Sequence, residues 1–291
     1  MSVRKPQTNY EIAYSAWLGS QKLSEQEVRQ RLRALRPSLQ KLRSGYRTNS
    51  VRVEYEGAIA EAYLLAYIPL YIRQAQEVLG HAFGETELST SGELRIGLLC
   101  PGPGPELIAL VRVLNDKCSL PPNLHVTYFD VANAGWSKAR NGLLRCANDI
   151  YEPHSISAEV IDIDLRSKLS PSTVSQFADF DIAVAQNMVN EVADSEQALS
   201  SLRNIMSSLK PGALVAISDL VKYAEAVGRA KGAFTQNLEV IHDKKPVYEV
   251  PAPDAGPLKE HFFGAYKDDL MWKRQLNLVE WIGVKRSTRR A

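Results

Sequence analysis

The sequence predicts an α/β fold built on a doubly wound, mostly parallel sheet. Between residues 94 and 218, short apolar runs alternate with helical patterns, as in parallel sheets with right-handed crossovers. The first run, Leu94–Leu99, passes through a Gly/Pro turn straight into a helix beginning at Pro105. Residues 1–92 show helical periodicity and no strand-rich section. We therefore expect a helical N-terminal region over 1–92, acting as a lid or a dimerisation region, and an α/β domain over 93–291, a division that suits a chain of 291 residues.

The first long helical pattern begins at a capping box, Ser24–Glu27, and should run to about Arg43 with a bend at Pro37. This pattern is strongly basic. Eight basic residues and no acidic residue lie between Val28 and Arg52, a concentration that could attract phosphates or could be a solvated face with its counter-charges elsewhere. The basic residues are Arg29, Arg31, Arg33, Arg36, Lys41, Arg43, Arg47 and Arg52.

A second helical pattern covers residues 53–79 and carries tyrosines on nearly one face. Pro69 should kink this helix and Gly80 should end it. The stripe, which includes Tyr63 and Tyr67, is expected to pack in the core, to form an aromatic wall over a substrate, or, if exposed, to form a dimer interface.

The remaining elements follow in alternation, separated by turn residues. Strands are predicted at 94–99, 124–129, 157–163, 180–185, 213–218 and 276–284. Helices are predicted at 105–115, 136–148, 170–177, 195–209 and 220–231. A Pro-rich section to about 258 should be irregular, and residues 220–265 are expected to form a substrate-specific insert.

Composition narrows the class of protein. A chain with 45% hydrophobic and 23% charged residues is typical of soluble globular proteins, and no apolar run approaches the ~20 residues of a membrane span. The first residues lack the apolar core of a signal peptide, so we expect a cytoplasmic protein. The three cysteines are not spaced as metal ligands, so we expect reduced thiols and no metal.

The turn at 100–104 could bind two classes of cofactor. A dinucleotide fingerprint requires a third glycine where this chain has Leu107, and Glu106 in the first helical turn would repel a pyrophosphate. A carboxylate there suits the helix dipole and could meet a cationic ligand. Asp130, at the end of the second strand, stands where an acidic residue can bind ribose hydroxyls, or it could cap the next helix.

An ordered set of motifs resembles the class I S-adenosylmethionine-dependent methyltransferases. It comprises Cys-Pro-Gly-Pro-Gly-Pro-Glu at 100–106, Tyr-Phe-Asp at 128–130, the acids after the third strand, the segment at 180–192, and Leu-Lys-Pro-Gly-Ala at 209–213. The resemblance implies a Rossmann-like, seven-stranded sheet and S-adenosylmethionine as cofactor. It also implies a cofactor site, which we assign to Cys100, Gly102, Gly104, Glu106, Asp130, Asp162, Asp164 and Asn187. In it the turn would hold the methionine moiety, Asp130 the ribose, and Asp162 or Asp164 the adenine.

Methyl transfer requires in-line positioning, exclusion of water and an acceptor atom that is deprotonated or carries a lone pair. Glu191, then His242 and His261, are the candidate proton acceptors, and Tyr63, Tyr67 and Asn190 the candidate substrate residues. We expect an O- or N-methyltransferase acting on a small molecule or a peptide.

Two further functions are open on sequence grounds. An RNA methyltransferase could grip phosphates with the basic helix and with the C-terminal Lys285, Arg286, Arg289 and Arg290. A non-catalytic binding module on the same fold is suggested by two departures from the resemblance. Leu98 stands where those proteins usually have an acid, and Cys100 where they have the first glycine.

Overall fold

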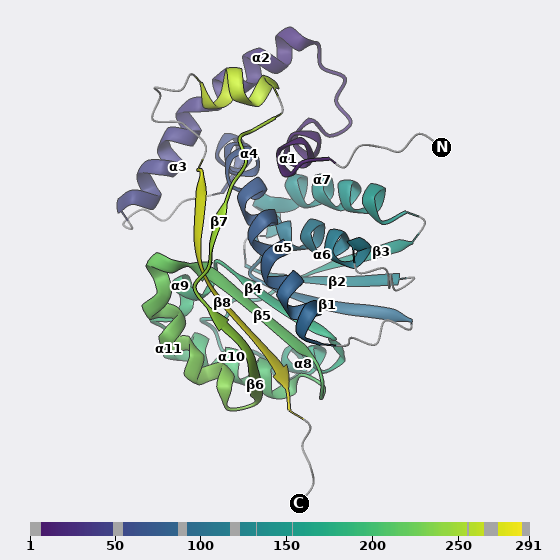
Figure 1. Cartoon of the computed structure of the whole chain (residues 1–291), viewed down its shortest axis with the longest axis vertical. Coiled ribbons are helices and arrows are strands. Elements are labelled where there is room, and N and C mark those ends of the chain that lie inside the picture. The colour runs from purple at the N-terminus through teal and green to yellow at the C-terminus, as the bar shows by residue number, and fades with distance from the viewer. Residues whose placement is uncertain are drawn as a thin grey trace, which may run out of the picture.

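The computed structural model describes residues 7–48, 55–86, 92–116, 123–131, 133–152, 154–254, 256–264 and 273–286 (Figure 1). The N-terminal helices are α1 (Asn9–Leu18), α2 (Glu25–Ala34), α3 (Arg36–Thr48), α4 (Gly57–Ala66) and α5 (Ile68–Glu85). The strands are β1 (Glu93–Leu99), β2 (Asn123–Asp130), β3 (Ser155–Asp162), β4 (Ile182–Gln186), β5 (Leu214–Leu220), β6 (Leu238–Lys244), β7 (Val247–Glu249) and β8 (Gln275–Lys285). The later helices are α6 (Pro105–Asp116), α7 (Asn133–Tyr151), α8 (Pro171–Ser175), η1 (Gln176–Asp179), α9 (Val189–Val192), α10 (Glu196–Ser208), η2 (Val221–Tyr223), α11 (Ala224–Thr235) and the π-helix η3 (Leu258–Phe263).

The sheet has the order β3-β2-β1-β4-β5-β8-β6, with β7 paired to β8 outside this path. Strands β1 to β5 are parallel, and β8 runs antiparallel to both β5 and β6. The α/β, doubly wound expectation is confirmed. Strands β2 and β3 lie on one side of β1, and β4 and β5 lie on the other side. The carboxyl ends of β1 and β4 therefore border the crevice where ligands bind in such sheets.

Each face of the sheet packs against its own layer of helices (Figure 1). Alternate residues of β1 point to opposite faces: Leu98 belongs to the core shared with α1 to α7, and Leu99 to the core shared with α10 and α11. The N-terminal helices thus share one hydrophobic core with the sheet, and α5 packs directly on α6, β5 and β8.

Local signals set the boundaries of several helices. The Ser24 hydroxyl accepts from Glu27 N and the Glu27 carboxylate accepts from Ser24 N, as the capping box predicts. The bend expected at Pro37 is a break at Leu35 between α2 and α3, and Pro37 lies in the first turn of α3, which continues to Thr48. Pro69 lies in the first turn of α5, which begins after a break at Tyr67.

Two expectations about the fold are wrong. Gly80 does not end the second helix, because α5 continues to Glu85 with Ala82 buried in the core. The section expected to be irregular contains β6. Its sequence alternates only weakly between polar and apolar residues, and the strand forms because it pairs with β8. Cys118, Arg52, Arg289 and Arg290 lie outside the described residues. In the described part of the chain, no helix is both long enough and apolar enough for a membrane span.

Candidate functional site

The turn between β1 and α6 packs against two aromatic rings. Gly102 and Gly104 have φ of 58° and 80°, and Cys100, unusually for a residue with a side chain, has φ of 48°. A Cβ on Gly104 would lie 2.3 Å from Tyr128 Cε1, and one on Gly102 would lie 3.4 Å from Trp136 Nε1. Both glycines are therefore required by backbone conformation, and Gly104 by close packing as well.

Asp130 is tied to this turn. Its Oδ2 accepts hydrogen bonds from Gly102 N and from Arg140 Nη2, both at 2.8 Å. Arg140 Nε also donates to Gly102 O at 2.6 Å, and both side chains of the ion pair are buried. The pair fixes the carboxylate beside the turn, where the resemblance places a ribose. Sequence reasoning missed Arg140, because its helical position ten residues after Asp130 carries no short-range signal.

Glu106 lies underneath the turn. Its side chain is only 2% exposed, and Oε2 has no hydrogen-bond partner among the described residues. Burial raises the pKa of this carboxyl to about 8, with Asp130 adding to the rise and Arg140 opposing it. At pH 7 this raised pKa favours the protonated form, so the environment disfavours the carboxylate charge that could meet a cationic ligand.

Carboxylates from several strand ends gather around the Cys100 thiol. Burial raises the pKa of this thiol, and the nearby charges of Asp130, Glu191 and Asp164 raise it further. Asp164 accepts from Arg166 N, and the carboxylates of Asp164 and Asp162 face solvent. The structure thus brings residues from the ends of β1, β2, β3 and β4 together at one edge of the sheet.

Asn187 follows β4 with φ of 55°. Its side chain exchanges two hydrogen bonds with Gln74 of α5, at 3.0 and 3.2 Å, and Gln74 also donates to Ser218 Oγ at 3.0 Å. The Asn187 amide, predicted to bind the cofactor, thus holds α5 against the ends of β4 and β5. Gln74 is fully buried and was missed, since a glutamine in an apolar helix has no local signature.

A cavity of about 520 Å³ opens beside this edge. Tyrosines of α4 and α5 form one wall, and residues that follow β4 and β5 form the other. The predicted residues Tyr63, Tyr67, Asn187, Asn190 and Glu191 line it together with Arg43, Tyr55, Ala66, Leu70, Tyr71, Asp219, Leu220, Val221, Lys222, Tyr223, Lys273 and Asn277.

The aromatic wall connects the cavity to the glycine turn. Tyr63 stacks on Tyr67 with ring centroids 5.3 Å apart, and its ring lies 5.2 Å from that of Trp136, the residue that faces Gly102. Tyr71 is 9% exposed, and Tyr63 and Tyr67 are half-buried. The stripe is thus partly core and partly cavity wall.

Asp219, at the end of β5, is a site residue that sequence reasoning missed. It is fully buried, and its carboxylate accepts from Leu220 N at 2.8 Å and Asn190 N at 3.3 Å. Burial raises its pKa to about 7, and the charge of Glu191 contributes to the rise. The usable signal was its place at the carboxyl end of a parallel strand, next to the cavity.

The two candidate histidines do not line the cavity. His242 lies on β6, 3.3 Å from a carboxylate oxygen of Glu280. His261 lies in η3, with Nε2 3.6 Å from Glu260. Glu191 is exposed on α9 at the cavity, and among the described residues Glu191 and Asp219 are the carboxyl groups that line it.

Some counter-charges of the basic segment lie on other parts of the chain. Arg29 pairs with Glu25 at 2.9 Å, and Arg31 pairs with Glu61 of α4 at 3.4 Å. Arg43 lies on the cavity wall. The segment is therefore in part an ordinary ion-paired helix face and in part a border of the site.

Comparison with known proteins yields structural similarity alone. No family model and no curated protein matches the chain. Among solved structures, it is similar to the N-methyltransferase NodS from Bradyrhizobium japonicum in complex with S-adenosyl-L-homocysteine (10% identity, 76% of this chain and 89% of that chain covered, TM-score 0.45). It is also similar to an S-adenosylmethionine-dependent methyltransferase from Clostridium acetobutylicum (9% identity, 74% of this chain and 92% of that chain covered, TM-score 0.45). A third similar structure is the [4+2]-cyclase SpnF (14% identity, 74% of this chain and 81% of that chain covered, TM-score 0.40). TM-scores below 0.5 carry no argument about function. The fold assignment therefore depends on the strand order β3-β2-β1-β4-β5-β8-β6, which is that of a doubly wound, Rossmann-like sheet, the fold that the sequence resemblance implied.

Proposed function

We propose that the protein is an S-adenosylmethionine-dependent methyltransferase that acts on a small molecule or a peptide. One observation carries the proposal. The glycine turn of β1, the acids at the ends of β2 and β3, and the loops after β4 and β5 meet at one edge of the sheet beside a cavity of about 520 Å³.

The donor set suits a cationic cofactor. The charges of Asp130, Asp164 and Glu191 raise the pKa of the Cys100 thiol, and that of Arg166 lowers it. Because Arg140 pairs with Asp130, the negative charge available to a cation there comes chiefly from Asp164 and Glu191. When bound, S-adenosylmethionine supplies a methyl group on a positively charged sulfur. The turn at 100–104 would hold its methionine part, Asp130 the ribose, and Asp162 or Asp164 the adenine. Arg140 would keep the Asp130 carboxylate in place.

The cavity would hold the methyl acceptor. The rings of Tyr63, Tyr67 and Tyr71 exclude water from one side, and exclusion of water strengthens the electrostatic interactions of the groups inside. Asp219 is the proton acceptor we propose in place of a histidine. A carboxyl with a pKa of about 7 is partly ionised at neutral pH, so it can accept a proton from an acceptor atom as the methyl group arrives. Asn190, which donates to Asp219, would orient it.

Two lysines on the cavity indicate the charge of the acceptor molecule. Lys222 and Lys273 both line the cavity and are exposed. Partial burial lowers the pKa of Lys273, and the positive charge of Lys222 lowers it further, so the two ammonium groups repel each other. An anionic substituent, such as a carboxylate or phosphate, would relieve this repulsion. We therefore propose an anionic substrate.

The same basic residues favour RNA as the second candidate substrate. Arg43, Lys222 and Lys273 line the cavity, and Arg43 belongs to the basic segment of α3. A nucleic acid strand could place its phosphates on them while one base enters the cavity.

The test combines cofactor binding with identification of the product. Calorimetry should detect S-adenosylmethionine and S-adenosylhomocysteine binding to the wild type, and Asp219→Asn should retain it, because the substitution removes only the proton acceptor. Asp243→Asn, on the far strand β6, is the matched control. A cell extract incubated with methyl-labelled cofactor should then yield label with the wild type and the control, and much less with Asp219→Asn.

Each outcome decides between the candidates. Label in a small molecule or peptide supports the proposal, and label confined to RNA supports the second candidate. Cofactor binding without any transfer would favour the binding module. Failure to bind either cofactor form at millimolar concentration would refute the methyltransferase proposal.

A further inference from the structure

A buried carboxylate outside the cavity is held by two histidines. Glu280 on β8 is fully buried. Its Oε2 lies 3.1 Å from His81 Nδ1 and 3.3 Å from His242 Nε2, and its Oε1 accepts from Tyr248 at 3.0 Å. In the part of the chain that the structure describes, no lysine or arginine pairs with Glu280. A charged carboxylate without a permanent cation is costly to bury, so a positive charge bound beside Glu280 would stabilise this cluster.

The three side chains converge from distant parts of the sequence. His81 comes from the end of α5, His242 from β6 and Glu280 from β8. The register of β6 against β8 shifts between Val240 and His242, so His242 lies opposite Ile282, on the face of the sheet that packs against α5. Such an irregularity commonly re-aims a side chain at a functional site.

We propose that His81, His242 and Glu280 form a binding site for one divalent transition-metal ion of the zinc type. Two imidazoles and one carboxylate are a common ligand set for such ions, with a fourth position open to water. The open position would lie on the side of His81, whose side chain is 42% exposed.

The distances suit this ligand set. Zinc–ligand bonds of about 2.1 Å place the donor atoms of a tetrahedral site about 3.4 Å apart. The two His–Glu separations are 3.1 and 3.3 Å, and all three donor atoms lie within 4.8 Å of one another. The two imidazole rings are stacked with centroids 4.6 Å apart and an interplanar angle of 24°. One ring must therefore turn for both nitrogen lone pairs to point at the same ion, and the half-exposed His81 has room to turn.

The site would clamp α5 to the sheet. Seven residues before His81, the same helix holds the loop after β4 through Gln74 and Asn187, and it contributes Tyr71 to the cavity. A metal at His81 would add a second attachment between α5 and the strands β6 and β8. The expected effect is a rise in thermal stability on metal binding, because the ion binds the folded state. This inference is independent of the proposed methyltransferase activity.

The test uses the full chain, stripped with a chelator and titrated with Co²⁺ as a visible probe and then with Zn²⁺. We expect one equivalent of Co²⁺ with the absorption of a four-coordinate nitrogen and oxygen site, displaced by Zn²⁺. His81→Ala, at a half-exposed position, should weaken binding roughly 10-fold or more, since the loss of even an outer-shell contact can cost that much. Glu280→Gln, which keeps the shape of the side chain, should do the same.

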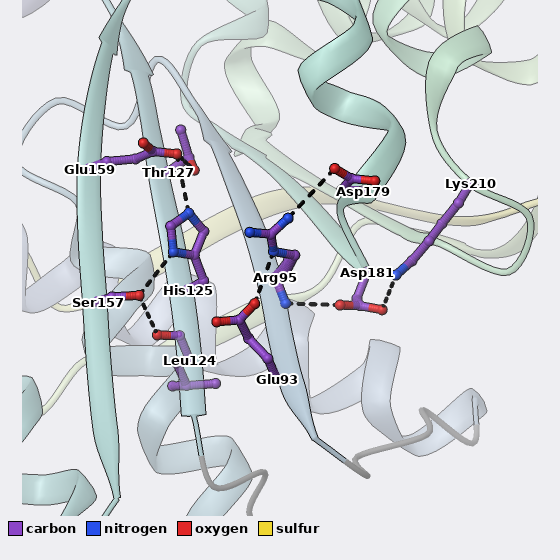
Figure 2. Close-up of polar contacts among 10 residues, drawn as sticks. All are labelled: Glu93, Arg95, Leu124, His125, Thr127, Ser157, Glu159, Asp179, Asp181 and Lys210. Carbon is purple, nitrogen blue, oxygen red and sulfur yellow. Dashed lines mark hydrogen bonds and ion pairs between the residues drawn. The ribbon is translucent and has the colours of Figure 1, made fainter.

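The matched control is a histidine–glutamate pair that lacks a second histidine. His125 on β2 lies 3.1 Å from Glu159 and 2.9 Å from Ser157 Oγ, on the polar face of β1 to β3 (Figure 2). His125→Ala should bind Co²⁺ like the wild type and gain the same increase in Tm with Zn²⁺, whereas folded His81→Ala should gain a smaller increase at the same Zn²⁺ concentration.

Three results would overturn the proposal. They are no stoichiometric binding by the wild type, equal effects of the His81 and His125 substitutions, and a thiolate-to-Co²⁺ absorption band. That band would assign the metal to a cysteine instead.

Discussion

Replacement of Glu106 by glutamine should change how stability depends on pH. The carboxyl has a pKa of about 8 in the folded protein, raised by burial, against 4.5 for the ordinary group. Between these values the unfolded chain has lost the proton and the folded chain still holds it. Because the folded state binds more protons, the free energy of unfolding contributed by this group falls as pH rises from about 4.5 to about 8.

The size of the effect follows from the shift. One pKa unit corresponds to about 1.4 kcal/mol, so between pH 5 and pH 8 Glu106 should lower the free energy of unfolding by on the order of 3–4 kcal/mol. Glu106→Gln cannot titrate and keeps the side-chain shape. The stability of the variant relative to the wild type should therefore increase with pH by that amount.

Urea unfolding at pH 5, 6, 7 and 8 measures this difference. Asp219, whose pKa of about 7 is also raised, contributes equally to both proteins and cancels. Glu196→Gln is the control, because that side chain is 92% exposed and should show no pH-dependent difference. A difference between Glu106→Gln and wild type that stays constant across this range would refute the assignment of Glu106 as a buried, protonated acid.

Three further substitutions test the turn and its supports. Cys100→Gly should stabilise the protein by about 1 kcal/mol in urea unfolding, because glycine adopts φ of 48° without strain, and a loss of stability would contradict this. Arg140→Gln should destabilise it by roughly 3–5 kcal/mol by leaving Asp130 buried without its cation. The double variant with Asp130→Asn should recover part of that loss, and additive losses would argue against coupling. Gln74→Leu should cost about 1–3 kcal/mol by leaving the Asn187 amide without its partner, and unchanged stability would show that this contact is dispensable.

Much of the candidate site could be placed from the sequence. In parallel sheets the carboxyl ends of neighbouring strands meet at one edge, so Asp130, Asp164 and Glu191 could be assigned to a common site from strand positions alone. The residues that set the chemistry of that site could not. Arg140, Asp219 and the adjacent lysines matter because of burial and proximity, and neither is encoded in local periodicity.

The sequence by itself determined the alternation of strands and helices from β1 to β5, the α/β class, the capping box of α2 and the glycine turn, since each depends on residues a few positions apart. Only the tertiary structure decided that Glu106 is buried with a raised pKa and that Asn187 faces Gln74. It alone brought His81 and Glu280 together across 199 positions of the chain. The physical reason is that hydrogen-bonding partners, dielectric environment and pKa are properties of packed surroundings, which distant segments create only when the chain is folded.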